Sequence, residues 1–163
     1  MLDDELLATA TELLAVCRAG KLRVATAESC TGGMIAGVLT AVAGSSDVVE
    51  RGFVTYTNEA KQEMLGVPEA LFESVGAVSK EVARAMAEGA LAHSPADLAV
   101  SVTGIAGPGG ATATKPVGLV HLAAARRGFE TVHAARVFDG DRAAVRRASV
   151  LTALDMLLGM ARR

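Results

Sequence analysis

The most informative segment of the sequence reads Thr26-Ala27-Glu28-Ser29-Cys30-Thr31-Gly32-Gly33. The residues before it, 22–26, form a short apolar run with β-branched members, which is typical of a buried strand. Residues 34–39 after it place apolar side chains at helical spacing. The segment is therefore expected to be the turn that joins a strand to a helix.

The polar residues of this turn are expected to lie where an anion is readily held. The first backbone amides of a helix have no partner within the helix, and the helix dipole favours negative charge there. Ser29, Cys30 and Thr31 would then lie beside a bound phosphate or a developing oxyanion. Serine and threonine are also common helix caps, and paired glycines often only allow close packing. Both interpretations stay open from this segment alone.

Helical patterns recur along the rest of the chain. Apolar residues at helical spacing, with capping residues at the ends, predict helices. Asn58 and Ser79 are interpreted as N-caps, residues 139–141 as the cap of the last helix, and Gly20 and Gly66 as residues that end helices. The expected helices span residues 2–18, 34–39, 59–65, 68–72, 80–93 and 142–160.

Further strands are expected where short β-branched or alternating runs occur. They span residues 48–56, with a bulge at Gly52, and residues 96–102, 117–125 and 131–138. The last two have hairpin spacing, so one strand should run antiparallel. The pattern predicts one domain, residues 1–163, with an α/β fold: a three-layer α/β/α sandwich on a mixed, mostly parallel sheet of about five strands.

Composition and charge limit the classes of function. The chain has 163 residues, 51% of them hydrophobic, and a net charge of -2, which disfavours a sequence-independent nucleic-acid coat. No window reaches the ~20 apolar residues of a membrane span, and the N-terminus is acidic where a signal peptide is basic. We therefore expect a cytoplasmic protein that binds neither nucleic acid nor membrane.

The residues that commonly bind metals or form catalytic triads are few. Cys17 and Cys30 have no metal-ligand spacing and suggest no disulfide framework, and Cys17 is expected in the core. His93, His121 and His133 are scattered and share no motif, which indicates neither a zinc centre nor a Ser-His-Asp triad. We expect no metal and no cofactor.

The turns after the strands supply a candidate nucleophile and a candidate base. A serine needs a base, and without a histidine motif the candidate is a lysine desolvated enough to lose its proton. Lys61 fits because it lies one turn inside a helix that starts at a strand end, although an exposed helix lysine is the alternative interpretation. Cys30 is the rival nucleophile, since a helix start lowers the pKa of a thiol, but no histidine stands near it in the sequence.

Four parts of the sequence resemble a known family. They are residues 26–33, residues 51–61, residues 76–79, and residues 102–110 with 115–118, in the family's order. On these motifs about residues 5–160 resemble the C-terminal domain family of the competence/damage-inducible protein CinA. The resemblance implies a nicotinamide-nucleotide amidohydrolase, which converts nicotinamide mononucleotide to nicotinate mononucleotide and ammonia in pyridine nucleotide salvage. Larger CinA proteins carry an N-terminal pyrophosphatase-like domain, so the chain looks like the stand-alone form.

The resemblance also implies roles for four residues. Ser29 would be the nucleophile and Lys61 its base, with Tyr56 and Thr103 nearby in the pocket. The chemistry of the residues agrees, because Ser29 can attack a carboxamide carbon and the backbone amides of residues 30–33 can hold the oxyanion.

The remaining candidates concern the phosphate and the ring of the substrate. The loop 104–110 offers unobstructed amides to a phosphate, and Arg142 offers a charge-assisted contact. Arg142 belongs to a basic cluster with Arg146 and Arg147, although such clusters are more often a solvated helix face. Tyr56 or Phe53 can face the cationic ring, with Glu28 adding negative potential, and Phe53 is more readily explained as core. The expected substrate-binding set is Glu28, Cys30, Thr31, Gly32, Gly33, Gly104, Gly107, Gly109 and Arg142.

The expected partners are a small nucleotide substrate and a second copy of the chain. The predicted hairpin places a strand at an edge of the sheet, and a two-fold dimer would cover that edge. One alternative class of function stays open, since α/β/α folds also serve as binding domains. The protein would then be a non-catalytic nucleotide-binding module, or a partner of a CinA-type pyrophosphatase domain.

Overall fold

The fold is built on one five-stranded sheet. The computed structural model describes residues 2–163. The strand order is β2-β1-β3-β4-β5, formed by β1 (Val24–Glu28), β2 (Val49–Val54), β3 (Leu98–Gly104), β4 (Leu119–Arg126) and β5 (Val132–Val137). β1 pairs in parallel with β2 and β3, whereas β4 is antiparallel to β3 and to β5. β4 therefore runs against the other four strands, as the hairpin spacing predicted.

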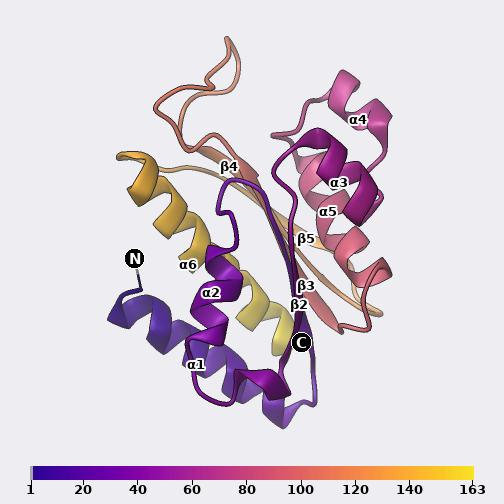
Figure 1. Ribbon diagram of the computed structural model, residues 1–163, viewed down its shortest axis with the longest axis vertical. Coiled ribbons are helices and arrows are strands. Elements are labelled where there is room, and N and C mark those ends of the chain that lie inside the picture. The colour runs from indigo at the N-terminus through magenta and orange to yellow at the C-terminus, as the bar shows by residue number, and fades with distance from the viewer. Residues whose placement is uncertain (1) are drawn as a thin grey trace.

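Helices cover both faces of this sheet (Figure 1). On one face lie α1 (Asp4–Ala19), α2 (Met34–Thr40) and α6 (Arg142–Ala161). On the other lie α3 (Asn58–Leu65), α4 (Glu69–Ser74) and α5 (Lys80–Ala92). A 3₁₀ turn, Ser45–Asp47, precedes β2. The predicted three-layer α/β/α sandwich with a mixed, mostly parallel sheet is confirmed.

Alternate residues of the central strands serve the two helical layers. Val24 and Val100 enter the core beneath α1, α2 and α6, while Ala25 and Ala99 face α5. All four side chains are fully or almost fully buried. Alanine on the α5 side leaves little bulk between sheet and helix, so this layer lies close to the sheet.

A glycine in α5 sets the position of α3. A Cβ at Gly89 would overlap the carbonyl group of Leu65, the last residue of α3. The two helices therefore pack with backbone against backbone, which only glycine permits. This contact fixes the helix that carries Lys61 at the end of the sheet where β1 and β2 finish.

The first strand lies two residues later than predicted. The Leu22 amide donates to the Cys17 carbonyl at the end of α1, and the Arg23 amide donates to the Asp97 carboxylate, both at 2.8 Å. These residues are therefore hydrogen-bonded outside the β1–β2 ladder. β1 ends at Glu28, and Ser29 is the first residue beyond it.

Two of the three predicted N-caps are confirmed. Ser79 caps α5 and Asp141 caps α6, each through its side-chain oxygen. α3 is capped one residue earlier than predicted, because the Thr57 hydroxyl accepts the Ala60 amide at 3.0 Å and Asn58 is the first helical residue. Both residues suit an N-cap, and their local sequence does not rank them.

The predicted bulge at Gly52 is wrong. The irregular pairing of β1 with β2 lies at Val24 and Ala25, whereas Gly52 pairs regularly with Thr26. A Cβ at Gly52 would come within 2.9 Å of the Thr26 hydroxyl oxygen, so glycine here permits a close approach. Among residues 2–163, no helix has both the length and the apolar character needed to cross a membrane.

Candidate active site

Ser29 and Lys61 meet where β1 ends. The Lys61 Nζ atom lies 3.1 Å from the Ser29 Oγ atom and donates at 3.1 Å to the backbone carbonyl of Tyr56. Only 2% of Lys61 and 8% of Ser29 are exposed. The parallel pairing of β1 with β2 creates this contact, because it brings the ends of both strands to one edge of the sheet. Residues 32 positions apart thus form a hydroxyl–amine pair.

The surroundings of Lys61 favour its neutral form. Burial lowers the pKa of Lys61 below its ordinary value, because desolvation penalises the ammonium ion. The negative charges of Glu59, and of Cys30 when it is a thiolate, oppose this effect but are smaller causes. Among the residues that the structure describes, no carboxylate lies within ion-pair distance of Lys61. The pair therefore has the arrangement of a serine beside an amine that can accept its proton.

The turn after Ser29 is held by its own backbone. The Ser29 amide donates to the Val102 carbonyl of β3, and the Ser29 carbonyl accepts the Gly32 amide, both at 3.0 Å. Gly32 and Gly33 have φ angles of 58° and 96°, which glycine adopts without strain. The paired glycines therefore allow the chain to reverse between β1 and α2.

Glu28 is a structural residue, contrary to its predicted place in the substrate pocket. It is fully buried, and its carboxylate accepts the amides of Ile35 at 2.9 Å and Ala36 at 3.1 Å. The start of α2 therefore holds a carboxylate from the same chain. The amides of Ile35 and Ala36 at this helix start, where an anion was expected, are therefore already engaged.

Tyr56, Arg142 and Gly107 come together at the rim of the site. The Arg142 guanidinium donates to the Tyr56 phenol oxygen at 3.0 Å and to the Gly107 carbonyl at 2.9 Å. Tyr56 is 58% exposed, so its ring lies open to a ligand. A hollow of about 510 Å³ adjoins Arg142, between residues 106–108 and the start of α6.

Of the other predicted residues, Thr103 and Thr31 are enclosed, whereas Gly109 is open. The buried Thr103 hydroxyl donates to the Ala77 carbonyl at 2.9 Å, which ties β3 to the segment before α5. Gly104 is the last residue of β3 and pairs with Val120, so it lies outside the open loop. Thr31 is fully buried. Gly109 is exposed, and nothing lies within 4 Å of the point where its Cβ would stand.

The structure disfavours Cys30 as the nucleophile. The pKa of the Cys30 thiol is raised to about 11, mainly by burial, and this effect outweighs the nearby Arg146 charge, which lowers it. The helix start predicted to lower this pKa is occupied by the Glu28 carboxylate. The thiol is therefore protonated at neutral pH, whereas a nucleophilic cysteine has to be a thiolate.

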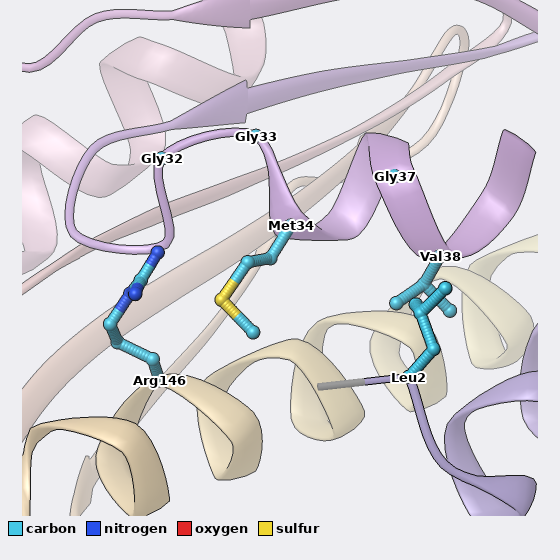
Figure 2. Close-up of a pocket in the computed structure, with 7 residues that line it drawn as sticks. All are labelled: Leu2, Gly32, Gly33, Met34, Gly37, Val38 and Arg146. Atoms are coloured by element: carbon cyan, nitrogen blue, oxygen red, sulfur yellow. The ribbon is translucent and has the colours of Figure 1, made fainter. Parts of the chain in front are cut away.

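Arg146 is the residue that sequence reasoning failed to place. It extends from α6 toward the turn before Gly32 (Figure 2). Its Nε atom donates to the Cys30 carbonyl and its Nη2 atom to the Thr31 carbonyl, both at 3.1 Å. The spacing of Arg142 and Arg146, four residues apart on one helix, was the available signal.

A histidine pair was also missed. The rings of His121 on β4 and His133 on β5 stack, with Nδ1 of the first 2.9 Å from Nε2 of the second. Burial lowers the pKa of both. They are diagonal neighbours across the hairpin, since His121 pairs with Ala135 and Ala123 pairs with His133.

The fold and the contact between Ser29 and Lys61 define an α/β/α protein with a serine–lysine site where β1 and β2 end. The model of the CinA C-terminal domain family matches residues 7–161, so the chain belongs to that family. Among its relatives, the nicotinamide-nucleotide amidohydrolase PncC of Pseudomonas putida is 52% identical over 155 residues, which cover 95% of this chain and 96% of that protein.

Other relatives are longer. A putative competence-damage inducible protein of Caldicellulosiruptor saccharolyticus is 53% identical over 136 residues, or 83% of this chain and 33% of that protein. The chain thus spans about a third of the length of several curated relatives it matches. A solved structure, the competence/damage inducible protein CihA of Agrobacterium tumefaciens, has a TM-score of 0.96 at 50% identity, covering 100% of this chain and 99% of that one.

Proposed function

We propose that this protein hydrolyses the carboxamide of nicotinamide mononucleotide to nicotinate mononucleotide and ammonia, in cytoplasmic pyridine nucleotide salvage. The observation that carries the proposal is the buried contact of 3.1 Å between Lys61 Nζ and Ser29 Oγ. The name of the Pseudomonas putida relative, which aligns with 95% of this chain, supports the choice of substrate.

The first half of the reaction forms an acyl-enzyme. Ser29 Oγ attacks the carboxamide carbon while the neutral Lys61 amine takes the hydroxyl proton. The tetrahedral intermediate then collapses, and the Lys61 ammonium returns the proton to the departing nitrogen. Ammonia leaves, and the nicotinoyl group stays on Ser29 as an ester.

The second half regenerates the enzyme. Water attacks the ester carbonyl while the Lys61 amine takes one of its protons, and that proton returns to Ser29 as the ester breaks. Two backbone amides are the candidates to hold the oxyanion in both halves, those of Cys30 and Gly33. The Gly32 amide already donates to the Ser29 carbonyl, and Thr31 is fully buried.

Arg142 is the proposed ligand of the substrate phosphate. Its guanidinium contacts a phenol and a carbonyl, and among residues 2–163 no carboxylate lies within ion-pair distance of it. An uncompensated guanidinium suits a phosphate dianion, which accepts charge-assisted hydrogen bonds. The hollow beside Gly107 gives the phosphate room, and the exposed Tyr56 ring is available to the cationic pyridinium.

The decisive experiment measures ammonia release from nicotinamide mononucleotide, with the nicotinate product identified by chromatography. We expect turnover by the wild type and none by Ser29→Ala. Binding of the nucleotide without turnover by the wild type would instead indicate the non-catalytic binding module.

We also propose a two-fold dimer. β5 is an edge strand of the sheet, and its last residue, Val137, is 60% exposed. Pairing of this edge with a second copy would satisfy its free backbone groups. Light scattering that gives a monomer at every concentration would exclude the dimer.

A further inference from the structure

Arg146 makes an unusual set of contacts for an arginine on a helix. It donates from Nε and Nη2 to two consecutive carbonyls, those of Cys30 and Thr31, immediately after Ser29. Among residues 2–163, no carboxylate lies within ion-pair distance of it. Its neighbour Arg147 differs, since it forms ion pairs at 2.6 Å with Asp3, the N-cap of α1, and with Glu5 in α1. The rigid fork of Arg146 is thus directed at the backbone of one turn.

The contacts of Arg146 lie on the opposite side of the turn from Lys61. Lys61 belongs to α3 and reaches Ser29 from the α3–α5 layer, whereas Arg146 belongs to α6 in the other layer. The turn is therefore hydrogen-bonded from both layers: Lys61 contacts the Ser29 hydroxyl from one, and Arg146 contacts the next two carbonyls from the other. If the Cys30 and Thr31 carbonyls changed their orientation, the Ser29 hydroxyl would move with them, because each residue between them has only two freely rotating backbone dihedrals.

The second half of the turn has little packing of its own, whereas Cys30 and Thr31 before it are buried. Gly32 and Gly33 carry no side chains that pack, and both have positive φ angles, which glycine leaves as readily as it enters. Both glycines border a hollow that Met34, Val38 and Arg146 also line (Figure 2). The volume of this hollow is about 320 Å³. At the glycines the shape of the turn therefore depends on hydrogen bonds to its carbonyls, those of Arg146 together with the Gly32 amide on Ser29 and the Met34 amide on Thr31.

We infer that Arg146 is a positioning residue: by holding the Cys30 and Thr31 carbonyls it fixes the direction from which Ser29 Oγ meets Lys61 and the substrate carbonyl. It acts through the turn and does not touch the substrate. This inference rests on the proposed function for its kinetic consequences. The competing role is that of a second phosphate ligand, since Arg146 also borders the hollow beside Arg142.

The two roles predict different kinetics. A phosphate ligand contributes equally to the bound substrate and to the transition state, so its loss raises KM and leaves kcat unchanged. A positioning residue aligns the reacting atoms, so its loss lowers kcat, and a misplacement near 1 Å costs about 10²-fold. For Arg146→Met we expect kcat to fall about 10- to 100-fold, with KM changed less than about twofold.

Arg146→Lys serves as the second variant and Arg147→Met as the matched control. Lysine keeps the charge but cannot reach both carbonyls with a rigid fork, so Arg146→Lys should also lose kcat. Arg147→Met loses ion pairs one residue away on the same helix and should keep wild-type kcat. Thermal melts of all three variants check that they fold.

A second readout does not depend on the nucleotide. A fluorophosphonate labels an activated serine when Ser29 Oγ displaces fluoride from phosphorus and the hydroxyl proton passes to Lys61. Labelling should slow in both Arg146 variants and stay unchanged in Arg147→Met. If the wild type is labelled but releases no ammonia, slow labelling of Arg146→Met would still support the positioning role while the proposed function fails. Unchanged labelling and kcat in Arg146→Met, or a raised KM with normal kcat, would overturn the inference.

Discussion

Replacing Lys61 with methionine separates the chemical role of this residue from the energetic effect of its burial. The side chain is 2% exposed, and burial holds its folded pKa below the ~10.4 of a free lysine. Between these two pKa values the unfolded chain binds a proton that the folded chain lacks. The free energy of unfolding of the wild type therefore decreases as the pH is lowered through this window, by at most about 1.4 kcal/mol per pH unit.

Lys61→Met has no such proton, so this contribution disappears. The variant loses two hydrogen bonds, to Ser29 Oγ and to the Tyr56 carbonyl, each worth about 0.5–1.5 kcal/mol at any pH. The variant should therefore be the less stable protein near pH 10.4. As the pH falls, the free energy of unfolding of the variant should rise relative to that of the wild type. Below the folded pKa of Lys61 the difference between the two free energies should stay constant.

The assay is urea denaturation at several pH values between 7 and 10.5, with Lys80→Met as the control at an exposed position. For a chain of this size a difference of 1 kcal/mol corresponds to about 2–4 °C in Tm, so thermal melts also resolve it. Parallel plots of the free energy of unfolding against pH for the wild type and Lys61→Met would refute the reasoning. Lys61 would then have the same pKa in the folded and unfolded states, and its burial would not favour it as the base.

The activity of related variants follows from the same geometry. Wild-type turnover should fall about tenfold per pH unit as the pH drops below the folded pKa of Lys61. Lys61→Arg cannot lose its proton and should therefore lose about 10²- to 10⁴-fold in kcat. If Lys61→Arg kept most of its turnover, Lys61 would be an electrostatic anchor and not the base. Ser29→Ala should abolish deamidation and remain folded, whereas Cys30→Ala should keep most activity in the same ammonia assay. An active Ser29→Ala and an inactive Cys30→Ala would instead identify the Cys30 thiol as the nucleophile. Arg142→Met should raise KM for the mononucleotide but not for nicotinamide riboside, which lacks the phosphate, and equal effects on both would remove the phosphate role. Glu28→Gln should lower the free energy of unfolding by about 1–3 kcal/mol, because an amide nitrogen would face a backbone amide of α2, and urea denaturation measures this loss.

The fold was largely predictable because its signals are local. The longer helices α1, α3, α5 and α6 show apolar spacing and a side-chain N-cap within their own sequence. The hairpin spacing of the last two strands placed the antiparallel strand correctly. Errors occurred where two adjacent residues suit one role, as with Thr57 and Asn58. They also occurred where distant groups end a strand, as with the Asp97 carboxylate at Arg23.

The site was predictable only in part, because burial and long-range contacts decide what its residues do. Lys61 shares its helix face with Leu65, four residues later, and both are buried, but sequence alone does not distinguish a buried lysine from an exposed one. Glu28 precedes Ser29 and was expected to face the ligand. Strand alternation instead directs it to the α2 face, where the two amides take its carboxylate.

Under the proposed function, Glu28 also helps to orient the substrate. An open helix start beside Ser29 would attract the substrate phosphate to the place where the carboxamide must react. Because the Glu28 carboxylate already accepts the amides of Ile35 and Ala36, that attraction is cancelled within the chain. The Arg142 guanidinium, which has no carboxylate partner among residues 2–163, donates instead to the Tyr56 phenol oxygen. The phosphate is therefore drawn to Arg142, and the carboxamide is left for Ser29.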